Sequence, residues 1–448
     1  GKNPKDMKYR FNWNAPIAVS MHDPSVIYHC GNVVLRSSDR GLNWTEISPD
    51  LTRNIPEHID WGGGPITNEG AGGENYHTIM YFSESSFDAN ELWVGTDDGL
   101  VKLTRDGGKT WTDVTPADMG EGIVNSIDLS VHEEGTAYVA FTRYKFGDFT
   151  PYVYITRDHG ATWTESSSGI EDHCHVRVVR EDTEVQGLLY AGTERGLFAS
   201  WDNGSNWQRF QLNLPIVPIT DLKVHHGDLI AATQGRAFWI LDDLTPVRNW
   251  ADAEAEKFMA FEPRNASLWG GMSPPQLSAM GRNPNYGITT YFNVASPDDT
   301  ITIEYANAYG NVLRTFSTVA EEKQNMLKIK PGSNKHVWNL RRASFSSVPG
   351  LMTFGGTSGT RIGPGKYKVT VTSGSESQSF DVEVKDDPRS KVTQEAHDEK
   401  QALLTKLYEA TQGVFDEVKN TRHIREQIGQ FQGRPGLDQD SSLMNKGK

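Results

Sequence analysis

Acidic side chains in turn-like segments are the residues of this 448-residue chain whose chemistry is easiest to name. A glycosidase cleaves its substrate with two carboxyl groups that flank the scissile bond, about 5–10 Å apart. The carboxylates that could form such a pair are Asp97, Asp98, Glu194, Asp242 and Asp243. Each also fits the simpler interpretation of a polar turn residue, so the sequence leaves catalysis open.

A glycine-rich segment at residues 61–77 carries a second set of useful side chains. Glu69, Glu74, Tyr76 and His77 lie in it, directly before a predicted strand, and could line a binding pocket. The segment lacks the Gly-Lys-Ser/Thr ending of a phosphate-binding loop, which argues against nucleotide binding. A surface loop without a ligand is the alternative interpretation.

Histidine and cysteine side chains give no metal site in this sequence. His173, Cys174 and His175 are adjacent, but neighbours along a strand point to opposite faces, so Cys174 cannot readily join both histidines. The other cysteine, Cys30, is distant, and neither cysteine lies in a CxxC motif. We therefore expect two buried free thiols, no metal ion and no cofactor.

The elements that must position these side chains come from a repeat. The pattern Ser/Thr-x-Asp-x-Gly-x-x-Trp, here called the Asp box, occurs four times. The aspartate can accept backbone N–H bonds in the turn, the glycine permits a positive φ, and the tryptophan can bury its ring between sheets. We expect a structural role for its aspartates and tryptophans: Asp39, Trp44, Asp106, Trp111, Asp158, Trp163, Asp202 and Trp207.

A strand–turn–strand pattern precedes each Asp box. Residues 92–101 and 189–198 resemble each other closely, and the mean repeat is roughly 48 residues, which suits the blade of a β-propeller. Five copies fit into residues 1–252, and the fifth has no box tryptophan. Because most closed propellers have more blades, we expect further blades outside this chain. Arg143, Arg180 and Arg236 could then approach one another at the propeller centre, as the arginine triad of a sialidase does.

The rest of the chain changes pattern twice. Short alternating strands with frequent turns predict an immunoglobulin-like β-sandwich over residues 253–388. Apolar residues then recur at spacings of three and four, which predicts a helical tail within residues 389–448, packed on the body or on a partner. The predicted fold class is therefore all-β, namely Asp-box propeller blades, then a β-sandwich and a C-terminal helix.

Charge and hydropathy exclude two classes of function. The formal net charge of −14 argues against a protein that binds nucleic acid through its phosphates. No apolar run approaches the roughly 18 residues of a membrane-spanning helix.

Taken together, these motifs resemble the large bacterial sortilin-like, BNR-repeat proteins. The resemblance rests on the four Asp boxes, the Gly-Thr-x-x-Gly hairpins and the runs at residues 32–39, 176–182 and 235–246. Such proteins are about twice as long, so the resemblance implies that this chain is their C-terminal half. They are often labelled glycosyl hydrolases by analogy of fold, and a fold does not establish a function.

Two functions follow as hypotheses. The first is an extracellular, cell-surface or periplasmic propeller that binds a protein, peptide or glycan without catalysis, and whose other partners are the missing propeller half or an assembly partner. The alternative is a glycoside hydrolase that acts on a polysaccharide through paired carboxylates.

Overall fold

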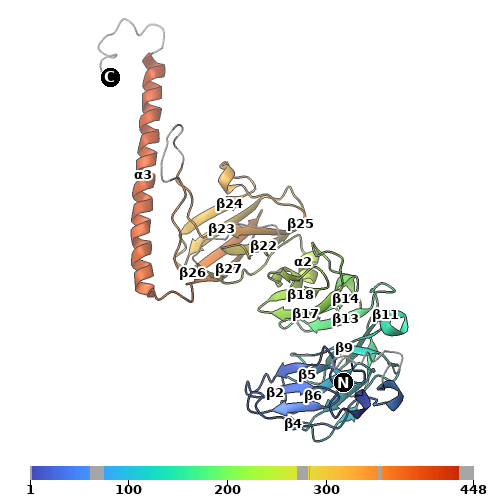
Figure 1. Cartoon of the computed structure of the whole chain (residues 1–448). Helices are drawn as coiled ribbons and strands as arrows, with labels where there is room; N and C mark the ends of the chain where they lie inside the picture. The colour runs from blue at the N-terminus through green and yellow to red at the C-terminus, as the bar shows by residue number, and fades with distance from the viewer. Residues whose placement is uncertain are drawn as a thin grey trace. The chain divides into compact units, whose positions relative to one another are not determined.

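The computed structural model describes residues 3–60, 75–269, 281, 283–346, 348, 350 and 356–432. The chain divides into two compact units, residues 1–244 and residues 245–448, which we describe separately (Figure 1).

The first unit consists of consecutive antiparallel sheets, each hydrogen-bonded in chain order. Their strands are β1 (Ile17–Val19), β2 (Ile27–Cys30), β3 (Val34–Ser37) and β4 (Thr45–Glu46) in blade 1; β5 (Ile79–Glu84), β6 (Leu92–Thr96), β7 (Val101–Thr104) and β8 (Thr112–Asp113) in blade 2; β9 (Ile123–Leu129), β10 (Ala137–Arg143), β11 (Asp148–Thr156) and β12 (Thr164–Glu165) in blade 3; β13 (Val176–Glu181), β14 (Leu189–Thr193), β15 (Gly196–Ser200) and β16 (Gln208–Arg209) in blade 4; and β17 (Ile219–His225), β18 (Asp228–Thr233) and β19 (Phe238–Leu241) in blade 5.

First strands of consecutive sheets lie next to one another, β5 beside β9, β9 beside β13 and β13 beside β17. Sheets that radiate from such a row of inner strands are the blades of a β-propeller. Short 3-10 helices at Pro4–Asp6, Pro56–His58 (η2) and Tyr144–Phe146 (η3) lie in the connections. The fifth sheet has three strands, where the sequence also lacks an Asp box.

Hydrophobic cores fill the spaces between neighbouring blades. Val94 faces blade 1 in a core with Tyr28, whereas its neighbour Trp93 faces blade 3 in a core with Val139 and Phe141. The alternation of side chains along a strand thus supplies one residue to each interface. For this reason β6 and β14 are buried along their whole length.

The four Asp-box turns share one hydrogen-bond pattern. In the first, the Ser37 hydroxyl donates to Asp39 and accepts from the Gly41 amide, both at 2.8 Å. The Asn43 side chain and amide both donate to Asp39, and they lower its pKa to about 2. Gly41 has φ +87°, the conformation for which a glycine is required.

The box tryptophans link neighbouring blades. The indole N–H of Trp111 donates to the Ile47 carbonyl in blade 1, at 3.0 Å. Trp163 and Trp207 repeat this contact with the carbonyls of Val114 and Ser166 in the preceding blades, at 2.7 and 2.8 Å. Trp44 differs, since it donates to Gly41 in its own turn and is 41% exposed.

The second unit begins with two short helices, α1 (Thr245–Arg248) and α2 (Trp250–Ala255). One sheet then has the order β20-β22-β25, and the other has the order β21-β27-β26-β23-β24, with β21 and β27 parallel. The strands are β20 (Phe258–Ala260), β21 (Ala266–Ser267), β22 (Ile288–Val294), β23 (Ile301–Asn307), β24 (Val312–Ser317), β25 (Gly332–Trp338), β26 (Gly365–Ser373) and β27 (Glu376–Lys385), with a 3-10 helix at Lys323–Asn325. Both sheets contribute to one hydrophobic core, in which Trp338 stacks on Tyr305.

The C-terminal helix α3 spans Gln394–Gln432. It packs against the rest of the second unit through Tyr408 and Phe415, whose rings stack on Phe345 at 4.9 and 5.8 Å. Of the apolar residues that recur at spacings of three and four, Leu404 and Val418 are partly buried, whereas Leu407 and Val414 are 52% and 64% exposed. The helix therefore packs on the two-sheet body along part of its length, and several of its apolar residues remain exposed. None of the helices that the structure describes is long and apolar enough to span a membrane.

Candidate functional site

One end of the blades gathers most of the predicted site residues. In an antiparallel meander, the start of the first strand and the hairpin between the second and third strands lie at the same end. We call this end of the first unit the hairpin face. The Asp boxes join the third and fourth strands and therefore lie at the opposite end, together with the turns between the first and second strands.

On blade 2, the hairpin face holds a stacked group of ring side chains. The rings of His58 and His77 are nearly parallel, with centroids 5.5 Å apart, and Tyr76 lies 4.4 Å from His77. Tyr76 donates its hydroxyl to Glu121, whose carboxylate also lies 3.7 Å from His58. Burial, followed by the charge and hydrogen bond of Glu121, raises the pKa of Tyr76, so it remains a phenol and a donor.

Two of the predicted carboxylates lie buried beneath this group of rings. Asp98 is fully buried and contacts the His77 ring, and it accepts a 2.7 Å bond from the Arg53 amide. Asp97 accepts bonds from the amide and hydroxyl of Thr78, both at 2.8 Å. Burial, and next the neighbouring Asp98, raises the pKa of Asp97 to about 8. Both carboxyl groups are therefore already engaged by residues of their own turn and of the neighbouring segments.

A second aromatic group lies on the hairpin face of blades 3 and 4. The His175 ring stacks on Tyr144 at 5.4 Å, and Phe149 lies 6.0 Å away. Arg177 lies over the Tyr144 ring and donates two bonds to Glu194, at 2.9 and 2.7 Å. Burial lowers the pKa of His175, so this imidazole is neutral at pH 7.

Arg143 lies between Glu121 of the first group and Asp148, the residue before Phe149 of the second group. Its Nε donates to the Glu121 carbonyl at 3.0 Å, and its guanidinium pairs with Asp148 at 3.1 Å. The side chains of Arg143 and Glu121 remain 34% and 28% exposed. The hairpin face therefore carries aromatic rings and charges of both signs across blades 2 to 4.

The three predicted arginines have different surroundings. Arg180 is buried at the inner strands, where it donates to Tyr81 and Asp221 at 2.7 and 2.8 Å and to the Leu222 carbonyl at 2.9 Å. Its contacts tie β5, β13 and β17 together. Arg236 is exposed in the hairpin between β18 and β19. No contact among the described residues joins two of these arginines.

The remaining sequence predictions are distributed as follows. Asp97 and Asp98 share one turn, Glu194 lies on the same face in blade 4, and Asp242 and Asp243 follow β19 at the opposite end. Glu69 and Glu74 lie outside the described residues. The two cysteines are buried and free, as expected, and Cys174 donates to Thr193.

Several residues at the hairpin face escaped the sequence analysis. His58, Glu121, Tyr144 and Arg177 lie in connections or at strand starts and belong to no repeated motif. The one available signal was their place directly before a predicted strand or after a predicted hairpin. That place is shared by many solvent-exposed loop residues.

No protein-family model matches the chain, and no curated protein matches it. Solved structures with a similar arrangement include YCF48 bound to D1 peptide, with a TM-score of 0.29 and 20% identity over 37% of this chain and 51% of that one. An ancestral GH74 enzyme has a TM-score of 0.34 and 12% identity over 69% and 39% of the two chains. The β-propeller domain of Cps50 (Swd1) from Myceliophteria thermophila has a TM-score of 0.36 and 14% identity over 52% and 65%. This chain therefore aligns with only part of each.

Proposed function

We propose that this protein is a secreted or cell-surface propeller that binds an extended peptide or protein segment on its hairpin face, without catalysis. One observation carries the proposal. The buried carboxylates Asp97 and Asp98 are occupied by the chain's own groups. The charged side chains of Glu121, Arg143 and Arg177 on the same face remain 28%, 34% and 22% exposed. Among the residues that the structure describes, such a surface offers contacts to a ligand, and its two buried carboxylates are already engaged.

The mixture of groups suits a peptide. Arg177 and Arg143 offer guanidinium donors, Glu194 and Glu121 offer acceptors, and Tyr144 offers an aromatic face. Tyrosine and arginine are enriched at the centres of protein interfaces because they combine apolar area with directional hydrogen bonds. Charges of both signs match a backbone with acidic and basic side chains better than a neutral sugar.

The hydrolase hypothesis requires carboxyl groups that face each other across a cleft. Asp97 and Asp98 are neighbours in one turn, and Glu194 is already paired with Arg177 in another blade. A panel of polysaccharides tests the hypothesis directly. Hydrolysis by the chain that Asp97→Asn or Glu194→Gln abolishes would overturn the proposal of a non-catalytic binder.

Binding itself is tested with peptides selected against the chain from a random phage-displayed library. We expect Arg177→Ala and Tyr144→Ala each to weaken the selected peptides about tenfold or more, because central arginine and tyrosine contacts carry most binding energy. The affinity is measured by isothermal titration calorimetry.

Arg157→Ala is the matched control. Arg157 pairs with Glu133 at the opposite end of blade 3, so its loss should leave peptide affinity unchanged. Equal weakening by the control, or selection of glycans and no peptides in a parallel glycan array, contradicts the proposal.

We propose a further partner for the outer face of blade 1, namely another propeller blade. Ile17 and Val19 are 71% and 59% exposed, whereas Ala18 between them packs toward blade 2. Trp44 lies on the blade whose box indole finds no carbonyl of a preceding blade. At the other end of the row, Phe238 and Ile240 of β19 are 76% and 57% exposed. Apolar faces of this kind suit burial against a sheet.

The occupant of the blade 1 face is tested with Trp44. In this chain, Trp44→Ala should reduce the free energy of unfolding by only about 1 kcal/mol, because the residue is 41% exposed and its indole bonds within its own turn. In a longer form of the protein that carries further blades, the same change should cost about 3–5 kcal/mol. An equal, small cost in both forms contradicts the proposal, as does dimerisation of this chain through the same face in sedimentation velocity.

The roles of the remaining parts are also proposals. We infer that the two sheets around one core form an immunoglobulin-like sandwich within residues 253–388, and that the helical tail within residues 389–448 docks a partner. An extracellular or periplasmic location is supported by the resemblance to the bacterial BNR-repeat proteins alone.

A further inference from the structure

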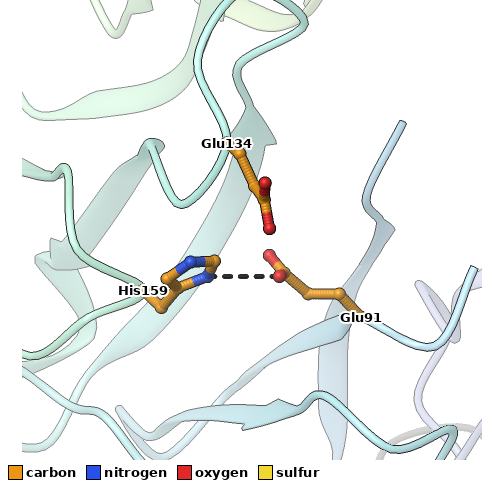
Figure 2. A group of neighbouring side chains, drawn as sticks. All are labelled: Glu91, Glu134 and His159. Carbon is orange, nitrogen blue, oxygen red and sulfur yellow. Dashed lines mark ion pairs between the residues drawn. The ribbon is translucent and has the colours of Figure 1, made fainter. Parts of the chain in front are cut away.

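Three side chains with metal-binding atoms converge between blades 2 and 3, at the end opposite to the hairpin face. Glu91 directly precedes β6, Glu134 lies in the turn between β9 and β10, and His159 lies in the Asp-box turn after β11. One ligand atom of each lies within 4.8 Å of the other two. Figure 2 shows the two carboxylates and the imidazole pointing toward one another.

Glu91 is held in place from one side. Its side chain is only 4% exposed, and the Trp93 indole donates to Oε1 at 2.9 Å. The second oxygen, Oε2, lies 3.1 Å from Nδ1 of His159. This contact is an ion pair when the imidazole is protonated (Figure 2), but Nδ1 is buried and its geometry gives it no hydrogen bond to any described residue. A buried imidazole nitrogen without a hydrogen bond is costly unless another group uses it.

The backbone fixes the position of the imidazole. His159 has φ +57°, and its amide donates to the Gly135 carbonyl at 3.0 Å. A Cβ atom at Gly135 would lie 2.8 Å from Nε2 of His159, so only glycine permits this approach. The imidazole ring is therefore held between the Asp-box turn that contains His159 and the β9–β10 turn that contains Gly135.

We propose that Glu91, Glu134 and His159 form a binding site for a divalent transition-metal ion, with Zn²⁺ as the best match. One imidazole nitrogen and two carboxylate oxygens are ligands that Zn²⁺ accepts, and water would complete its coordination. The two carboxylates neutralise the charge of the ion. Since Glu91 belongs to blade 2 and the other two ligands belong to blade 3, the ion links the blades.

Arg105 is the cation that competes for this site. Its guanidinium lies 3.7 Å from Glu91 and 3.9 Å from Glu134, and its side chain is 56% exposed. These distances exceed those of direct hydrogen bonds, so little holds the guanidinium there. A neighbouring cleft of about 790 Å³, which Arg105 and His159 both line, gives the side chain room to move and gives the ion access.

The repeat supplies a matched variant for the test. The position of His159 corresponds in blade 4 to Asn203, which has φ +59° and lies beside Gly187 as His159 lies beside Gly135. Asparagine therefore fits this turn, and His159→Asn should remove a ligand while the blade keeps its fold. Glu134→Gln removes the charge of a second ligand, whose side chain is 56% exposed.

The chain is first treated with a chelator and then titrated with Zn²⁺ by calorimetry. We expect His159→Asn and Glu134→Gln each to weaken Zn²⁺ binding at least tenfold, and Arg105→Gln to strengthen it several-fold. The melting temperature of the wild type should rise with Zn²⁺, and that of His159→Asn should not. The proposal is overturned if the wild type does not bind Zn²⁺ or if both ligand variants bind it with unchanged affinity. It is also overturned if Arg105→Gln does not strengthen Zn²⁺ binding.

Discussion

Replacement of Trp207 with alanine should reduce the free energy of unfolding by about 3–5 kcal/mol, the cost of removing a large aromatic side chain from a core. Trp207 is 3% exposed and lies in the core between blades 3 and 4. Its indole also donates to the Ser166 carbonyl, which loses this partner in the variant. Urea denaturation of the wild type and the variant measures the difference.

Trp44→Ala is the control, since it removes the same side chain from the same motif in blade 1. Trp44 is 41% exposed and its indole donates to the Gly41 carbonyl of its own turn, so its loss should cost only about 1 kcal/mol. If the two variants lose equal stability, the tryptophans do not stabilise the unit by burial between blades.

The second large effect concerns pH. The folded chain raises the pKa of Asp97 from its ordinary value of 3.8 to about 8, chiefly by burial and next through Asp98. Between these values the folded state holds a proton that the unfolded state has released. Stability is therefore fully present below about pH 4 and falls as the pH rises toward 8, by on the order of a few kcal/mol.

Asp97→Asn removes this dependence because an amide has no proton to lose. We expect the variant to match the wild type near pH 4 and to melt at a higher temperature near pH 8. Its amide oxygen can still accept the bond from the Thr78 amide. Thermal melts at several pH values measure the two profiles.

Asp39→Asn provides a control of opposite sign. Hydrogen bonds from Asn43 lower the pKa of Asp39 to about 2, so the stability it contributes is present above pH 4 and lost as the pH falls toward 2. Its loss should therefore lower the melting temperature at neutral pH. Parallel pH profiles for the wild type and Asp97→Asn would show that Asp97 is ionised in the folded chain.

The buried Asp97–Asp98 turn lies beneath the hairpin face and holds the side chains above it in place. Asp98 holds His77 and the Arg53 segment, and through them it places the rings that border Glu121. A binding surface gains affinity when its contact groups are ordered before the ligand arrives. On this view, the two acidic residues support binding from beneath the surface, and the exposed groups around them contact the peptide.

The repeating parts of this protein are readable from its amino-acid sequence. Each box tryptophan stands five residues after the aspartate of its own turn, and a segment of strand-like pattern precedes each box. The four tryptophans are Trp44, Trp111, Trp163 and Trp207. Local hydrogen bonds and strand periodicity depend on neighbours in the chain, so their signals are readable without coordinates. In the second unit, the alternation of apolar and polar residues over 288–294 likewise coincides with strand β22.

Which turns meet depends on the packing of the blades. His58 and Glu121 lie in separate connections, yet both contact Tyr76, and Glu91 meets His159 across a blade interface. This packing also gives different roles to equal motifs, since Trp207 is buried while Trp44 is exposed. The physical reason is that such contacts depend on how the apolar faces of successive sheets pack. Packing is set by the whole core, and the spacing of polar residues along the chain does not record it.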